Sequence, residues 1–377
     1  MQNSIRHIFL AGLSMVCISI MYFLLLVMRA PMPVILAVVA AGIILLFTWF
    51  KKAVPAITTP ERHTELYTVI VIAGLTWLGH DIYLFSDRHG GWDAWAIWNY
   101  HARFLSDSAH WQMMFVNHGN DHPDYPLCLP SFFGFLIRLC SGRGYMFIPF
   151  AFSVFITIAI VAILFSALAK KNLLIAAIVL YLIVTDTFFV HTGISQYADT
   201  PLAFFLLCAL ISLDQSVAHK KYIIISAAFL GCCAWTKNEG AILALVFLAF
   251  NAIVFFDKKN IRYTFTGLVL PLLALLVFKL CYAPPNDITS GFTTKTLSQA
   301  FDAASYRLIF NTFKDNLHDK FHYMEILFFI YLALCMLRRK RPSLHFVMLI
   351  FCLLVYLSFY IFSSHDLQWH LNTSLDR

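Results

Sequence analysis

The chain has 377 residues, of which 60% are hydrophobic and only 12% are charged, with a formal net charge of +7. A soluble domain of this length cannot bury so much apolar surface, so the composition excludes a soluble globular protein and favours a chain that resides in lipid. The positive charge lies mostly in short segments between apolar runs, so it indicates membrane topology, and no nucleic-acid partner is expected.

Apolar runs long enough to cross about 30 Å of hydrocarbon recur along the sequence. The first follows Arg6 and is interpreted as a signal anchor, because no small-residue cleavage site comes after it. The runs predict an all-α polytopic bundle of about eleven spans, forming a single membrane domain over residues 1–377. The spans are expected near 8–28, 32–50, 66–85, 146–168, 172–190, 200–213, 222–236, 240–256, 263–282, 322–337 and 344–362.

Basic pairs between these spans predict the topology, because short cytoplasmic loops hold the excess of Lys and Arg. The long loops 86–145 and 283–321 then lie on the outer side. The basic clusters assigned to the cytoplasm are Lys51/Lys52, Lys170/Lys171, Lys220/Lys221, Lys258/Lys259/Arg262 and Arg338–Arg341.

Residues 126–140 are apolar but short, and they contain Pro126, Pro130 and Gly134. Treating them as a span would move several later basic clusters to the outer side. Treating them as an interfacial or re-entrant helix keeps every cluster inside, and this interpretation is the one we adopt.

The polar segments then gather on the outer face. Ionisable residues within the spans also lie near outer ends, whereas an ion-coupled transporter more often places them near the midplane. This pattern is typical of a site where a water-accessible substrate meets a lipid-borne one. These span residues are Asp81, Asp186, Lys279 and Glu325.

The segment after Gly90–Gly91 is expected to be a helix lying at the interface. Its spacing places Trp95, Trp98, Ala102 and Leu105 on one stripe, with Asp93 roughly opposite. Two interpretations of Asp93 remain open. It is either an N-cap beside a tryptophan anchor, or a carboxylate held at the water–lipid boundary as a general base.

Three further segments carry polar residues. His122–Pro126 is a rigid loop between two prolines, which is either structural or a binding loop. Asp199 precedes Thr200–Pro201, as an ordinary helix N-cap does. Lys237 and Glu239 share a very short outer turn, and an outer lysine that departs from the positive-inside pattern is well placed to hold a lipid phosphate.

In this order, the segments GWDAWAIWNYHARFL, HPDYPLCLP, QYADTPLA, WTKNEGA and HDLQWHLNTSLDR resemble membrane glycosyltransferases of the GT-C fold. The similarity is to bacterial members that use a polyprenyl-phosphate sugar, related to protein mannosyltransferases and lipid A aminoarabinose transferases. It implies that Asp93 is the catalytic base. It further implies a substrate-binding set of His122, Asp124, Tyr125, Asp199, Lys237, Glu239, Asp366, His370 and Arg377.

The resemblance implies a hexosyl- or pentosyltransferase with a polyprenyl-phosphate sugar donor. The acceptor would be a glycolipid such as lipopolysaccharide, a polysaccharide or a protein. The site would face the periplasmic or extracellular side of a bacterial plasma membrane, in contact with membrane lipid. No cofactor and no metal ligand set is predicted, although the carboxylates could hold a divalent metal.

Two alternatives to the transferase remain open. One is a transporter or flippase of lipid-linked sugars, which should show midplane charges or inverted repeats. The other is an inactive relative, because related chains usually continue past the arginine that matches Arg377.

Overall fold

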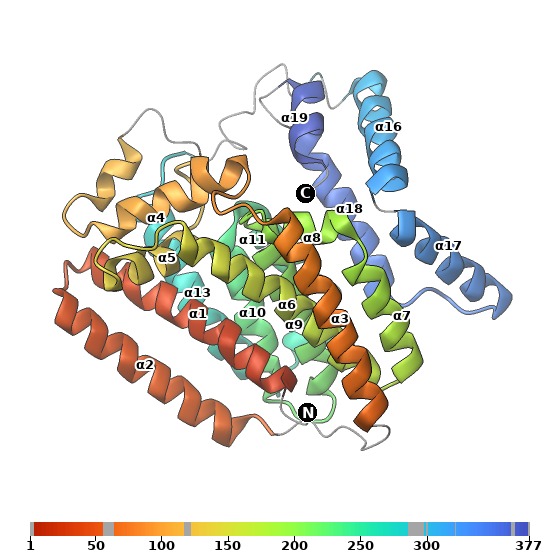
Figure 1. Ribbon diagram of the computed structural model, residues 1–377, viewed down its shortest axis with the longest axis horizontal. Helices are drawn as coiled ribbons and strands as arrows, with labels where there is room; N and C mark the ends of the chain where they lie inside the picture. Colours follow the sequence, from red (N-terminus) through yellow and green to blue (C-terminus); the bar gives the residue numbers. More distant parts are fainter. Residues whose placement is uncertain are drawn as a thin grey trace. The chain divides into compact units, whose positions relative to one another are not determined.

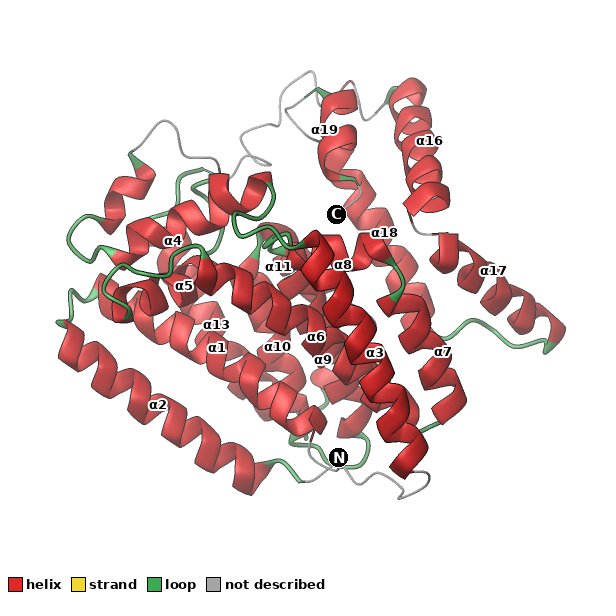
Figure 2. Cartoon of the chain, in the orientation of Figure 1, coloured by secondary structure: helices red, strands yellow, loops and turns green. Residues whose placement is uncertain are grey.

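The computed structural model describes residues 4–55, 64–116, 122–285, 298, 301–320, 322–362 and 366–375. Within these ranges every regular element is a helix and no strand occurs, which confirms the predicted all-α class (Figure 2). In chain order the helices are α1 (Ser4–Val27), α2 (Met32–Ala53), α3 (Thr64–Phe85), η1 (Ala94–Trp98), α4 (Asn99–Ser106), η2 (Trp111–Phe115), α5 (Cys128–Leu139), α6 (Phe147–Ala169), α7 (Leu173–Val184), α8 (Thr187–Ile194), α9 (Asp199–Ser216), α10 (Tyr222–Thr236), α11 (Asn238–Phe250), α12 (Ala252–Phe255), α13 (Ile261–Cys281), α16 (Ala303–Lys320), α17 (His322–Leu337), α18 (Leu344–Ile361) and α19 (Leu367–Ser374).

Among the described helices, six are long and apolar enough to cross a membrane, namely α1, α2, α3, α6, α13 and α18. Two bent pairs raise the number to eight if each is one span: α7 with α8, bent by 67°, and α16 with α17, bent by 101°. Helices α5, α10 and α11 are apolar but shorter. The chain therefore has the character of a multi-pass membrane protein, and the count of eleven spans stays a prediction.

The chain divides into two compact units. The first comprises Met1–Ala244 and Ala252–Ala283, and the second comprises Leu245–Asn251 and Pro284–Arg377. Each unit is described by itself below.

Helix α10 is the centre of packing in the first unit (Figure 1). Almost all of its residues are buried, so it has no polar face. It packs against α9 and α13. Close approach to α13 depends on small residues: a Cβ at Gly267 would collide with the backbone of Ile224, and Gly231 lies against Pro271. Such small-residue contacts are how helices pack tightly in lipid, where burial of apolar surface gives little driving force.

The basic pairs of the first unit gather at one end of its helices, which we call the lysine end. The Arg6 guanidinium, at the start of α1, lies 5.7 Å from the centre of the Phe50 ring near the end of α2. The Tyr222 hydroxyl, at the start of α10, donates a 2.9 Å hydrogen bond to the Pro55 carbonyl. The lysine end therefore holds Lys51–Lys52 and Lys220–Lys221.

Helix α13 brings a third basic cluster to the lysine end. It runs parallel to α10, because Gly267 meets Ile224 toward the start of both helices while the rings of Phe278 and Trp235 meet at 6.1 Å toward their ends. The cluster Lys258–Arg262, at the start of α13, is therefore at the same end as Lys220–Lys221.

Helix α6 adds the fourth cluster. Lys170, which follows α6, interacts electrostatically with Asp214 near the end of α9, a few residues before Lys220. The fifth cluster, Arg338–Arg341, belongs to the second unit.

The polar loops of the first unit lie at its opposite end, which we call the acid end. Lys237 directly follows α10, whose 15 residues place it about 22 Å from the start of that helix. The first unit thus keeps its basic pairs and its polar loops at opposite ends. The acid end is made of the segments Gly90–Asp93, His122–Tyr125, Ser195–Asp199 and Lys237–Glu239.

Helix α5 covers the short apolar segment that is ambiguous in the sequence. Its 12 residues are fewer than the roughly 20 that a crossing needs. Ser19 of α1 anchors its first turn: the Ser19 hydroxyl donates to the Cys128 carbonyl at 2.7 Å and accepts from the Trp235 indole at 3.0 Å. The length favours a segment that does not span, and the anchor fixes the loop His122–Leu127 that precedes the helix.

Candidate functional site

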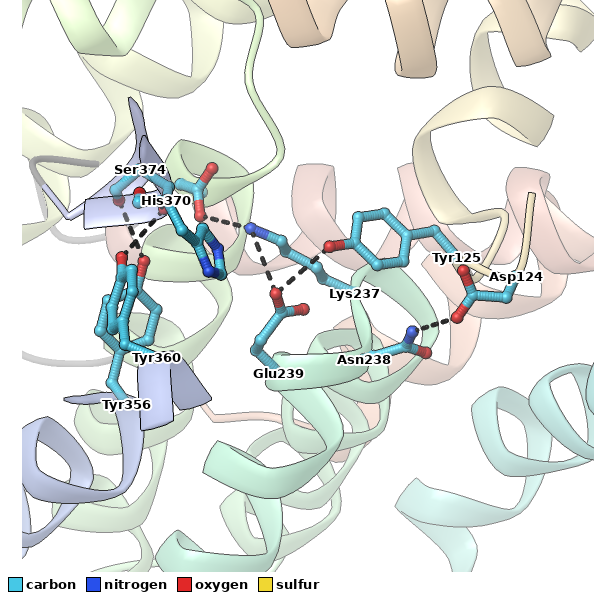
Figure 3. A network of polar contacts seen from close by, with 10 residues as sticks. Asp124, Tyr125, Lys237, Asn238, Glu239, Tyr356, Tyr360, His370 and Ser374 are labelled. Carbon is cyan, nitrogen blue, oxygen red and sulfur yellow. Dashed lines mark hydrogen bonds and ion pairs between the residues drawn. The ribbon is translucent and has the colours of Figure 1, made fainter. Parts of the chain in front are cut away.

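The centre of the acid end is an ion cluster around Lys237. Its ammonium Nζ lies 3.0 Å from Asp199 Oδ1 and 3.7 Å from Glu239 Oε1 (Figure 3). The Lys237 side chain is only 12% exposed, and both carboxylate side chains are 16% exposed. We call these three residues the Lys237 cluster. Since two carboxylates flank one ammonium, the ionised cluster carries one net negative charge.

The chain forms this cluster through a sharp turn between α10 and α11. Lys237 is extended, with φ −153° and ψ 152°, so it breaks the helix. Helix α11 begins at the next residue, Asn238, and the Lys237 ammonium lies 3.7 Å from the carboxylate of Glu239 in its first turn. Gly240 makes the turn possible, because a Cβ there would collide with the backbone carbonyl of Cys233. The turn thus presents both side chains to the start of α9.

Electrostatics keep Lys237 charged. Burial alone would lower the pKa of its ammonium, but Asp199 and Glu239 act in the opposite direction, and the net pKa lies well above the usual value. Lys237 therefore remains a cation that orders two carboxylates. As a substrate-binding residue it stays a prediction, and an incoming phosphate would compete with carboxylates already in place.

Asp199 departs from the expected N-cap. Helix α9 begins at Asp199 itself, and the residue at the cap position is Ala198. The Asp199 carboxylate lies in the first helical turn, where the helix dipole favours a negative charge, and it accepts a hydrogen bond from Lys237. Pro201, two residues after Asp199, is typical of a helix start, as the sequence indicated.

Asp124 forms a second, separate pair at this end. Its side chain is 1% exposed, and its Oδ2 accepts a 2.7 Å hydrogen bond from the Asn238 amide. Lys279 of α13 donates to the Asp124 backbone carbonyl at 2.5 Å and approaches Oδ2 at 3.8 Å. A buried carboxylate needs such partners, so Asp124 fastens the His122–Leu127 loop to α11 and α13.

Tyr125 connects this loop to the Lys237 cluster. Its ring is stacked between His122, at 4.6 Å, and Trp98, at 5.6 Å between ring centres. Its hydroxyl donates to Glu239 Oε1 at 3.4 Å (Figure 3). Burial and the nearby Glu239 carboxylate raise the pKa of Tyr125 well above its usual value, so the hydroxyl stays a donor. The stack joins η1 to the turn that carries Glu239.

Asp93 stands at the start of the η1–α4 helical segment and is half-buried. Within the described stretch 64–116, its side chain makes no capping hydrogen bond to η1, so the N-cap alternative is not seen. The five residues that follow form a π-helix, a conformation that occurs frequently at functional sites. The base role of Asp93 stays a prediction.

Glycines hold the segment before Asp93 against the loop that leads to Asp199. Gly90 has φ +69°, in the region that glycine alone adopts freely. The Gly91 amide donates to the Ser195 carbonyl at 3.0 Å, and the Tyr197 ring lies where a Cβ on Gly91 would be. Gln196 reinforces the contact by accepting from the Asn99 amide at 2.8 Å. These contacts bring the segments of Asp93 and Asp199 together.

The π-helix also corrects the predicted tryptophan stripe. Trp98, Ala102 and Leu105 are buried as expected, but Trp95 is 55% exposed. The π-helix turns less per residue than an α-helix, so a residue three before Trp98 falls off the buried face.

Two buried polar atoms near Tyr125 have no hydrogen-bond partner among the described residues: the Glu239 Oε2 acceptor and the Trp98 indole donor. A hydroxyl group both donates and accepts, so it matches either atom. Leaving such groups unpaired costs about 1–3 kcal/mol each.

The carboxyl-terminal candidates belong to the second unit. Asp366 caps α19 by accepting from the Trp369 amide at 2.9 Å, which is a structural role. The His370 ring lies 4.7 Å from that of Tyr360, whose hydroxyl is within 3.1 Å of Ser374 Oγ (Figure 3). Arg377 lies outside the described residues. The first unit alone thus brings together Tyr125, Asp199, Lys237 and Glu239.

The structure adds partners that the sequence did not assign. In the sequence, Lys279 is an isolated charge near a span end. Such a charge is expected to have a partner, but the sequence does not identify which residue it is. Asn238 lay unnoticed between Lys237 and Glu239. Among the described residues, no group of three or more His, Cys, Asp or Glu side chains is arranged to hold a metal ion.

Chemical labelling will test the electrostatics of Lys237. In wild-type protein we expect Lys237 to be among the least reactive lysines toward an amine-acylating reagent at pH about 9, because its raised pKa leaves little neutral amine. Asp199→Asn removes a charge that holds the pKa up, so reactivity should rise. Mass spectrometry measures both, with exposed Lys258 and Lys259 as internal references. Unchanged reactivity in Asp199→Asn would contradict the assignment.

Comparisons of the chain with protein-family models, with curated proteins and with solved structures gave no match.

Proposed function

We propose that this chain is a membrane glycosyltransferase of the GT-C type. It transfers a sugar from a polyprenyl-phosphate donor to an acceptor hydroxyl at the acid end. The observation that carries the proposal is that separate loops collect Asp93, the Lys237 cluster and the Tyr125 stack at the end of the first unit opposite the basic pairs. The resemblance of the same segments to GT-C transferases supports it.

The proposed reaction is an inverting single displacement. Asp93 accepts the proton of the acceptor hydroxyl while that oxygen bonds to the anomeric carbon. The bond from the anomeric carbon to the phosphate oxygen breaks, and polyprenyl phosphate leaves from the opposite face. A half-buried carboxylate at the boundary of a bundle can meet both a lipid-borne donor and an acceptor from water.

The partners of the sugar follow from the unsatisfied atoms around Tyr125. Glu239 Oε2 and the Trp98 indole are an acceptor and a donor, which suits sugar hydroxyls. In this proposal Lys237 positions Glu239, and His122 and Tyr125 border the donor. His370 and Arg377 stay substrate-binding residues implied by the resemblance, and Asp366 caps the helix that carries His370.

The net negative charge of the Lys237 cluster sets a requirement on the reaction. The Asp124–Lys279 pair is neutral, so the cationic charge needed by a leaving phosphate must come from elsewhere. Arg377 is one candidate.

The proposed topology has about eleven spans, with α5 at the interface. The lysine end faces the cytoplasm, and the acid end faces the periplasm or exterior of a bacterial plasma membrane. The Lys and Arg pairs support this orientation.

Cysteine labelling in intact cells will test the orientation. In a variant without native cysteines, Arg88→Cys should react with a membrane-impermeant maleimide from outside, because Arg88 is exposed beside the acid end. Lys221→Cys, exposed at the lysine end, should react only after permeabilisation. The reverse pattern would place the acid end in the cytoplasm and remove the proposed site from the outer face.

The function itself is tested with purified full-length protein in lipid nanodiscs. Radiolabelled polyprenyl-phosphate hexoses and pentoses are supplied with glycolipid, polysaccharide or peptide acceptors, and labelled product is measured. Transfer supports the proposal. Movement of donor between the leaflets of proteoliposomes without transfer would instead identify a flippase.

A further inference from the structure

Three arginines of the first unit lie around the packing of α4 against α5, and we call them the arginine cluster: Arg103, Arg138 and Arg143. Arg103 is on α4, and its guanidinium lies 5.3 Å from the centre of the Tyr145 ring. Arg143 is in the turn just before Tyr145 and is exposed. Arg138 is in the last turn of α5. The ring contact brings α4 against the turn that follows α5.

Tight packing places Arg138 beside the same part of α4. Gly134, one turn before Arg138, abuts Ala102 and Leu105, where a Cβ would not fit. The Tyr22 hydroxyl donates to the Leu105 carbonyl at 2.6 Å and also interacts with the Arg138 guanidinium. Arg138 is thus held between α1 and the end of α4.

The guanidinium of Arg138 is incompletely satisfied. Its Nη1 is buried and has no hydrogen-bond partner among the described residues. Asp107 acts electrostatically on Tyr22, and its exposed carboxylate is already engaged by His110 at 3.0 Å. Arg103, Arg138 and Arg143 contribute three positive charges, and among the described residues none of them forms an ion pair with a carboxylate. A buried guanidinium nitrogen and excess positive charge together call for an anion.

The location separates this cluster from the Lys237 cluster. Helix α5 starts just after Tyr125 and rises for ten residues from Cys128 to Arg138, which is about 15 Å. A phosphate held by Arg138 is therefore too far from Asp124 and Tyr125 to belong to a donor whose sugar binds beside those two residues.

We propose that Arg103, Arg138 and Arg143 form a binding site for a phosphate group, carried by the headgroup of an anionic lipid or supplied as free phosphate. Arginine is suited to it, because its planar fork donates two parallel hydrogen bonds to phosphate oxygens. Tyr145 holds the Arg103 guanidinium in place through a cation–π contact. The site does not depend on the proposed transferase activity.

Lipid binding is measured on full-length protein in nanodiscs of phosphatidylcholine with a minor fraction of spin-labelled phosphatidylglycerol. Arg138→Gln and Arg143→Gln should each weaken the association about tenfold, the loss of one charge-assisted contact. Arg143 is exposed, so its variant keeps the fold. Arg88→Gln is the matched control: it removes an exposed arginine from the same loop and should leave binding within about twofold.

Titration of lipid-depleted protein in detergent with inorganic phosphate distinguishes the two sources. If phosphate binds and the two variants weaken it, the site takes free phosphate. If only the lipid binds, it takes a headgroup. Wild-type binding of both probes by Arg138→Gln and Arg143→Gln, or an equal loss in Arg88→Gln, would overturn the proposal.

Discussion

Asp93→Asn should abolish sugar transfer while leaving expression and membrane insertion at wild-type levels. A positioned general base contributes about 10²–10⁴-fold to such a reaction, and asparagine keeps the shape of the side chain without its basicity. The loss should fall on kcat at saturating donor and acceptor, because proton transfer acts in the transition state. Radiolabelled transfer by the purified variant measures it.

Asp107→Asn is the matched control for this experiment. Asp107 lies in the same long loop, but its side chain is 54% exposed and has only local partners among the described residues, the His110 ring and the Ala109 amide. Transfer by this variant should stay within about twofold of wild type, since an exposed pair contributes little. Near-normal activity in Asp93→Asn would remove Asp93 from the mechanism, and an equal loss in both variants would indicate a general effect on the loop.

The large features of this fold could be predicted because they depend on composition and local pattern. Apolar runs predict membrane helices, because a backbone in lipid finds no water and must satisfy its own hydrogen bonds. Four of the basic clusters do share one end of the first unit, which the charge pattern indicated before any contact was known. The short length of residues 126–140 likewise indicated a helix that does not span, and α5 has only 12 residues.

The site could be predicted only as a set of segments. Lys237 stood out because it departs from the positive-inside pattern, but its partner Asp199 lies 38 residues earlier in the sequence. No local pattern encodes that pairing, and the sequence therefore offered Lys237 as free to bind phosphate. The packing of α9 against α10 creates the pair, since it brings the start of α9, with Asp199, to the end of α10, with Lys237.

The backbone at Asp93 shows a second limit. Periodicity assumes 3.6 residues per turn, so it placed Trp95 with Trp98 on one stripe. The π-helix Ala94–Trp98 breaks that assumption, and Trp95 is exposed. The wider turn is sustained by tertiary contacts, among them the stacking of Trp98 on Tyr125. Such contacts are not readable from the segment itself.

Lys237→Met should destabilise the folded protein by about 3–5 kcal/mol, the cost of removing one partner from a buried ion pair. Methionine fills a similar volume, so the loss comes mainly from leaving Asp199 and Glu239 buried beside each other without a cation. Thermal unfolding in detergent, followed by the helical circular dichroism signal, measures it. Lys221→Met, an exposed lysine at the lysine end, is the matched control and should change stability by less than about 0.5 kcal/mol.

The pH dependence and a triple variant identify the cause. The folded-state pKa of Lys237 is raised, so its contribution is complete below the ordinary lysine value of 10.5 and is lost only as pH rises through the higher folded value. The difference between wild type and Lys237→Met should therefore stay constant from pH about 7 to 9. Adding Asp199→Asn and Glu239→Gln removes the uncompensated charges and should restore most of the lost stability. A triple variant as unstable as Lys237→Met would show that packing, and not charge compensation, sets the role of this lysine.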